Sequence, residues 1–81
     1  MKINMSDDYI KTPDANLCSA LVTLGYELEL EREHAKKVTF KLSGKGVKQA
    51  EQKYWNNKLR LPAKELLGNR RDILARVFND A

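Results

Sequence analysis

Two runs with alternating apolar and polar residues constrain this chain more than any other feature. In residues 26–31 every second residue is apolar and the others are glutamates, and residues 37–42 alternate in the same way with lysine and threonine. A period of two places the apolar side chains on one face of a strand and the polar ones on the other. The runs therefore predict an antiparallel hairpin, connected through residues 32–37, with one face on a core.

The polar face of this hairpin accounts for the acidic row without assigning it a catalytic role. One strand carries Glu27, Glu29 and Glu31 on this face, and the next strand carries two lysines and a threonine, Lys37, Thr39 and Lys41. Opposite charges across strands contribute roughly 0.2–1 kcal/mol per pair. A metal site with Asp7 and Asp8 would need carboxylates that converge on Mg²⁺, whereas side chains of one strand face point outward in parallel. We therefore expect a solvated face and no metal.

A short strand and a helix are expected before the hairpin. Residues 9–11 suit a short strand, and Thr12-Pro13-Asp14 suits a helix start, with Thr12 as N-cap, Pro13 in the first helical position and Asp14 near the positive end of the dipole. Four apolar residues then follow the i, i+3, i+4, i+7 pattern of one buried face: Leu17, Ala20, Leu21 and Leu24. Gly25 ends this helix in the C′ position.

Two further helices are expected after the hairpin. The stretch Ser43-Gly44-Lys45-Gly46 leads into a helix that ends near Asn57, with Ser43 as its N-cap. A last helix begins around Pro62 after an extended segment, and Gly68 inside it predicts a break or a close approach. Its apolar stripe consists of Leu66, Leu67, Ile73, Leu74, Val77 and Phe78.

The order of elements is then β-α-β-β-α-α, which indicates a small α+β fold. An antiparallel sheet, made of the hairpin and a possible short N-terminal strand, packs against three helices. The first and last helices are expected to cover the hairpin through Leu21, Leu24, Leu28, Phe40, Leu74 and Phe78.

The length of 81 residues predicts a single domain over 1–81, with residues 1–7 flexible. A chain of this size buries only about 60% of its unfolded surface and has little room for a deep pocket beside its core. Its single cysteine, Cys18, excludes an internal disulfide and is expected to be a small buried hydrophobe. The chain shows no signal-like or membrane-spanning run, so we expect a cytoplasmic protein that does not engage a membrane.

Several catalytic and metal-binding patterns are missing from the sequence. The only histidine, His34, falls in an expected turn without a second histidine or a cysteine pair, so a zinc site is not predicted. The sequence also shows no nucleophile–base pair. We therefore expect a protein that is not an enzyme and needs no cofactor.

The glycines at residues 44 and 46 raise the question of a phosphate-binding loop. A P-loop requires G-x-x-x-x-G-K-[ST], whereas here the glycines are two apart and Val47 follows the second one. A helix N-terminus with Lys45 and Lys48 nearby could still hold a phosphate. A turn that caps a helix is the favoured interpretation, and a contact with a nucleic-acid backbone is the alternative.

Charge is unevenly distributed along the chain. Residues 1–35 carry three basic residues against seven acidic ones, a balance of −4, and residues 36–81 carry twelve against four, a balance of +8. Such asymmetry suggests an anionic partner. The candidate contact residues for nucleic acid or another partner are Lys45, Lys48, Lys53, Trp55, Lys58, Arg60, Lys64, Arg70 and Arg71.

Two adjacent aromatic residues, Tyr54 and Trp55, point to different sides of the expected helix that ends near Asn57. Tyr54 fits the buried stripe formed by Val47 and Ala50. Trp55 then either packs against the last helix, which is favoured, or is partly exposed near Lys53, Lys58 and Arg60. An exposed tryptophan suits base stacking or a protein interface.

The order of these motifs resembles a family of short domains of undefined function encoded by phages and bacteria. The resemblance covers about residues 8–79 and rests on "TPDANLCSALVTLGYELE", "KKVTFKL", "AEQKYWNNKLRLPAKEL" and the paired arginines of the last helix. It implies a phage, prophage or other mobile element as the source. It carries no catalytic signature, and because the sequence departs from a typical member at the basic cluster Arg70-Arg71, no role is assigned to these two residues by analogy.

Two functional hypotheses follow from these features. The first is a small accessory protein that binds nucleic acid through its basic C-terminal half. The second is a regulator or inhibitor that docks on a host or phage protein. A homodimer formed through an edge strand of the small sheet is a further possibility.

Overall fold

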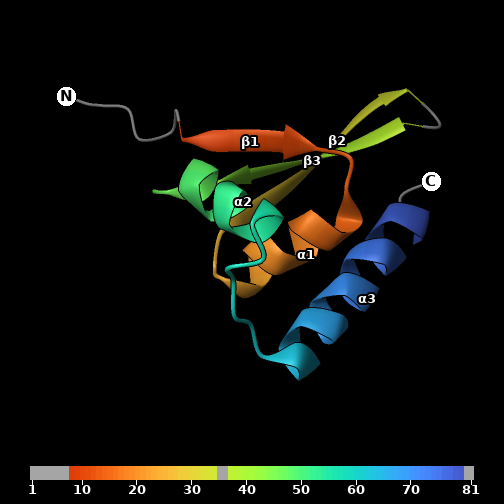
Figure 1. Ribbon diagram of the computed structural model, residues 1–81. Coiled ribbons are helices and arrows are strands. Elements are labelled where there is room, and N and C mark those ends of the chain that lie inside the picture. Colours follow the sequence, from red (N-terminus) through yellow and green to blue (C-terminus); the bar gives the residue numbers. More distant parts are fainter. Residues whose placement is uncertain (1–7, 35–36, 80–81) are drawn as a thin grey trace.

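A computed structural model describes residues 8–34 and 37–79, which form one three-stranded sheet and three helices (Figure 1). The elements, in chain order, are β1 (Tyr9–Thr12), α1 (Ala15–Thr23), β2 (Glu27–His34), β3 (Lys37–Ser43), α2 (Val47–Trp55) and α3 (Ala63–Asn79). The predicted α+β fold and its β-α-β-β-α-α order are confirmed. The expectation that residues 1–7 are flexible lies outside the described residues.

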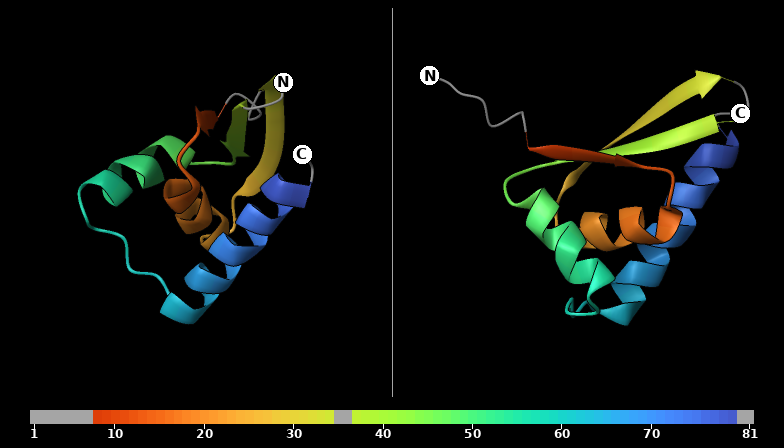
Figure 2. Two further views of the ribbon diagram at one scale, coloured as in Figure 1. Left: turned by 90° about the vertical axis from the view of Figure 1, so that its right-hand side faces the viewer. Right: turned by 45° about the horizontal axis from the view of Figure 1, so that its top comes forward.

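The sheet has the order β1-β3-β2, with both neighbours antiparallel to the central strand β3. Leu42 of β3 lies opposite Ile10 on one side and opposite Leu28 on the other. All three helices lie on the same face of this sheet (Figures 1 and 2). The alternation read from the sequence therefore does separate a face that packs on helices from a polar one.

The polar face of the sheet is held by charged pairs, one of which was expected. Glu29 lies opposite Lys41, and their charged atoms are 3.9 Å apart. Glu31 lies opposite Thr39, and its carboxylate pairs with Lys11 of β1 at 3.1 Å. The pair between Lys11 and Glu31 spans the central strand and could not be predicted before the strand order was known.

Helix α1 forms the centre of the molecule. Leu17, Cys18 and Leu21 are fully buried and belong to the same core cluster as Phe40 and Leu42 of β3. The expected identity of Cys18 as a buried hydrophobe is confirmed, and burial raises the pKa of its thiol to about 12, with Arg76 opposing this shift and Asp14 adding slightly to it.

The N-terminus of α1 differs from the sequence-based expectation. Thr12 is the last residue of β1, paired with Phe40, and α1 begins only at Ala15, so Thr12 lies too far from the first turn to be its N-cap. Asp14 is the N-cap instead, and its carboxylate accepts hydrogen bonds from the backbone N–H groups of Asn16 and Leu17 at 2.9 and 3.3 Å. The Thr12 hydroxyl accepts from the Asp14 N–H at 3.1 Å, which fixes the turn between strand and helix.

The C-terminus of α1 is closed in the way predicted for Gly25. The Gly25 N–H donates to the carbonyl of Val22, and the Tyr26 N–H donates to that of Leu21. These two bonds define a Schellman motif. They turn the chain directly from α1 into β2.

Three other expectations on element boundaries are wrong. Residues 32–34 belong to β2, because the hairpin ladder continues past a bulge between Arg32 and His34, so His34 ends a strand rather than lying in a turn. Ser43 is the last residue of β3 and does not cap α2, whose N-cap is Gly46. Helix α3 runs unbroken through Gly68, where an added Cβ would meet nothing within 4 Å.

The core includes only part of the expected set. Leu21 and Phe40 are buried, and Leu28 packs against the cluster, but Leu24 is 42% exposed and Phe78 is 74% exposed. Leu24 is the C-cap residue of α1, at the turn that leads into β2. The contact of α3 with the core is made by Ile73 and Val77, so Phe78 points to another side of the helix.

We expect Gly68→Ala to stabilise the protein by about 0.5–1 kcal/mol, because alanine restricts the unfolded chain and favours a helix interior. Urea unfolding followed by circular dichroism measures the change. Gly44→Ala is the matched control and should destabilise the protein, because Gly44 has a φ of +148° and its added Cβ would lie 2.6 Å from Cδ1 of Tyr26. A loss of stability for Gly68→Ala would contradict the described surroundings of Gly68.

Candidate binding groove

The glycine turn that resembles a phosphate loop is occupied by a tyrosine. The ring of Tyr26 packs over Gly44, and its hydroxyl donates to the carbonyl oxygen of Lys45 at 3.1 Å. The N–H of Val47 donates to the carbonyl of Gly44, and Gly46 takes a left-handed conformation with φ +81°. The stretch therefore works as a turn from β3 into α2, as the favoured interpretation had it, but without a side-chain cap on the helix.

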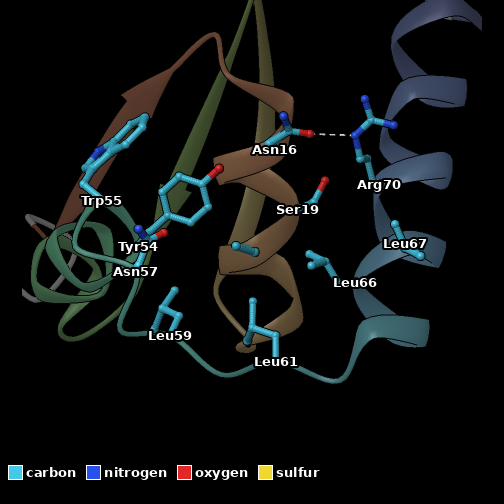
Figure 3. Close-up of a pocket in the computed structure, with 11 residues that line it drawn as sticks. Asn16, Ser19, Tyr54, Trp55, Asn57, Leu59, Leu61, Leu66, Leu67 and Arg70 are labelled. Carbon is cyan, nitrogen blue, oxygen red and sulfur yellow. Dashed lines mark hydrogen bonds between the residues drawn. The ribbon is translucent and has the colours of Figure 1, made fainter.

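A groove opens on the other side of the molecule, between α2 and α3. Its volume is about 770 Å³, within the typical range of about 300–1,000 Å³ for ligand sites. The groove lies open on the surface, so it is not the deep pocket beside the core for which so short a chain was expected to have little room. The residues that line it are Asn16, Ser19, Ala20, Tyr54, Trp55, Asn57, Leu59, Leu61, Leu66, Leu67 and Arg70 (Figure 3).

The groove exists because α2 and α3 are held apart. Helix α1 lies between them, as the right-hand view of Figure 2 shows, and its residues Asn16, Ser19 and Ala20 line the groove. Helix α2 ends at Trp55, Asn57 turns the chain with a φ of +59°, and an irregular segment leads to α3. Pro62 favours an extended conformation at Leu61. Within this segment Leu59 and Leu61 line the groove, and Lys58 and Arg60 are exposed and do not line it.

Two hydrogen bonds between side chains fix α3 to α1. The Arg70 Nε–H donates to the Oδ1 atom of Asn16 at 2.6 Å (Figure 3), and the Asn69 amide donates to the hydroxyl of Thr23 at 3.0 Å. Asn16 and Arg70 are 54 positions apart, so no local pattern in the sequence identifies this pair. Arg70, a predicted partner-binding residue, thus has a structural role that sequence reasoning missed.

The two aromatic residues of α2 form one wall of the groove. Their rings make an edge-to-face contact with centroids 4.9 Å apart. Tyr54 is half-buried, as expected, and desolvation raises the pKa of its phenol, with a smaller contribution from Asp14. Trp55 is 56% exposed, so the alternative of a partly exposed indole is confirmed and the favoured packing against α3 is wrong.

All nine predicted contact residues are exposed, but of these only Trp55 and Arg70 line the groove. Lys53 precedes Trp55 by two positions on α2, which turns the two side chains roughly 160° apart. Glu51 precedes Trp55 by four positions and therefore lies on the same side of the helix as the indole. Lys48, seven positions before Trp55, shares that side, so α2 places Lys48 and Glu51 on the side of the indole and turns the predicted neighbour Lys53 away from it.

No group of three or more histidine, cysteine, aspartate or glutamate side chains within residues 8–34 and 37–79 is arranged to hold a metal ion. Over the same ranges, none of the helices is long and apolar enough to cross a membrane.

Comparison with known proteins adds no relative: no family model, curated protein or solved structure gives a significant match to the chain. The resemblance to short phage-encoded domains therefore stays a prediction from the sequence. The function has to be argued from the groove itself.

We expect Trp55→Ala to change the free energy of unfolding by less than about 1 kcal/mol, because the indole is more than half exposed. A tryptophan in a packed core would cost about 3–5 kcal/mol. Leu17→Ala, at a fully buried position, is the reference and should cost about 2–5 kcal/mol. Chemical denaturation of the two variants measures both values, and an equal loss for both would mean that Trp55 is a core residue.

Proposed function

We propose that the protein is a non-enzymatic binding module that docks a segment of another protein in the groove between α2 and α3. The observation that carries this proposal is the exposure of large apolar side chains on both walls, Trp55 at 56% and Leu67 at 63%. Small domains seldom leave apolar side chains clustered at the surface without an interaction that covers them. Tryptophan is also among the residues that contribute most to protein interfaces.

The chemistry of the lining supports binding more than catalysis. Among the described residues, the groove is lined by leucines, two aromatic rings, amides, a hydroxyl and one guanidinium group. The guanidinium of Arg70 is already bonded to Asn16. Such a surface offers apolar contact area with a few hydrogen-bonding groups, which is the composition of a recognition site.

Nucleic acid is the second candidate ligand, and the exposed Trp55 favours it. An indole can stack on a base, and exposed lysines and arginines on α2, on α3 and between them can contact phosphates. The groove suits this ligand less well, because its leucines provide no stacking surface and the charge of Lys48 on the Trp55 side of α2 is balanced there by Glu51. The protein segment is therefore the ligand that we place first.

The source of the partner follows from the sequence resemblance to phage- and bacterium-encoded domains. A regulator or inhibitor encoded by a mobile element acts on a protein of its bacterial host. We therefore place the partner in the host cytoplasm.

A photo-crosslinking amino acid at position 67 tests the proposed function. The matched control carries the same amino acid at position 9, on the polar face of the sheet, where Tyr9 is 38% exposed. After irradiation in bacterial cells we expect a discrete adduct from position 67 that protease removes and nuclease does not. Equal adducts from both positions would contradict the groove as the functional surface. An adduct that nuclease removes would assign the groove to nucleic acid.

A further inference from the structure

Helix α3 carries a second apolar stripe in addition to the one that packs on the core. Leu66, Ile73 and Val77 face α1 and the core cluster. Leu67, Leu74 and Phe78 follow at i, i+7 and i+11, a spacing that places them on one side of a helix. Leu67 is 63% exposed and Phe78 is 74% exposed, so the ends of this second stripe are open.

The second stripe extends the groove wall along α3. Leu67 lines the groove, and Leu74 and Phe78 lie about two and three turns further toward the C-terminus. The distance along the axis from residue 67 to residue 78 is about 16 Å at 1.5 Å per residue. An occupant that covers this length needs about three helical turns.

The charged residues of α3 are unevenly distributed around the helix relative to this second stripe. At 100° per residue, Lys64, Arg70 and Arg71 lie within roughly 60° of Leu67, whereas Glu65 and Asp72 lie roughly 140–160° away. Three of the four basic residues of α3 therefore flank the exposed apolar side chains, whereas Arg76, which lies roughly 180° from Leu67, and the two acidic residues of α3 point elsewhere. A ligand that approaches Leu67 and Phe78 meets positive charge on the α3 side.

We propose that the segment docked on this surface is an acidic amphipathic α-helix of three to four turns that lies along α3. Its apolar side chains contact Trp55, Leu67 and Phe78, and its carboxylates face Lys64 and Arg71. The inference rests on the proposed function, because it names the chemical class of the segment that the groove binds. A helix is favoured over a strand, because the surface is a groove between two helices and receives side chains at i, i+4 and i+7.

The same charges disfavour a second copy of this chain as the occupant. In an antiparallel pair of α3 helices joined through Leu67 and Phe78, the two Arg71 side chains would approach one another near the middle. Like charges at an interface oppose association. An acidic helix forms the same apolar contacts and gains favourable charge pairs instead.

A peptide selection tests this inference with a random library of 16-residue peptides displayed on phage. The full chain serves as bait, and the Leu67→Ser variant serves for counter-selection, because a polar residue at this exposed position removes the contact without disturbing the core. We expect enriched peptides with apolar residues at i, i+4 and i+7 and with several glutamates or aspartates between them.

Two matched variants measure the contribution of charge to binding of an enriched peptide. Arg71→Glu and Lys53→Glu change the net charge equally, but Arg71 flanks the stripe, whereas Lys53 lies on the side of α2 that faces away from Trp55. We expect Arg71→Glu to weaken binding by about tenfold or more and Lys53→Glu to leave it within about twofold, because a charge reversal acts most strongly at close range. The loss of affinity caused by Arg71→Glu should be smaller at high salt, because salt screens the interaction between charges.

The outcomes separate this inference from the proposed function. Peptides that depend on Leu67 but are neutral or basic, or lack the helical spacing, overturn the acidic helix and leave the groove as a protein-binding surface. Failure to enrich any peptide over the Leu67→Ser variant overturns both. A dimer of the free protein that dissociates on Leu67→Ser would assign the surface to a second copy and also overturns the acidic helix.

Discussion

The burial of α1 on several sides at once is the constraint on which the rest of the structure depends. Its side chains Leu17 and Leu21 are fully buried in a cluster with Phe40 and Leu42 of the central strand. Helices α2 and α3 both pack on α1, and α1 in turn packs on all three strands of the sheet (Figure 2). Because α1 occupies the centre, α2 and α3 remain apart, and the groove is the space left between them.

Local patterns predicted the elements well, because each depends on neighbours in sequence. The hairpin followed from alternation, α1 from four apolar residues at helical spacing, and its end from Gly25. The strand order did not follow, because the pairing of β1 with β3 joins residues more than twenty-five positions apart. Thr12 was wrongly expected to cap α1 for the same reason, since its pairing with Phe40 makes it part of β1, and α1 begins only at Ala15.

The candidate site was less predictable than the fold, because it depends on which apolar residues remain uncovered. The sequence placed Leu67 and Phe78 in the same stripe as Ile73 and Val77, and only the packing of α3 on α1 separates the two sets. The nine contact candidates were chosen for charge, yet Lys53 and Trp55 diverge on α2, and Arg70 binds Asn16. The distribution of charge along the sequence suggested an anionic partner. The apolar surface that such a partner would cover is formed by tertiary packing and could not be predicted from the sequence.

The central claim is that the groove stands open in the free protein, and acrylamide quenching of the single tryptophan, Trp55, tests it most directly. The account predicts a quenching constant about half that of the unfolded chain or greater, since the side chain is 56% exposed, with no dependence on protein concentration. Strong shielding at every concentration would show that the groove is closed by the chain itself. Shielding that grows with concentration would show that a second copy covers it, and either result would contradict the account.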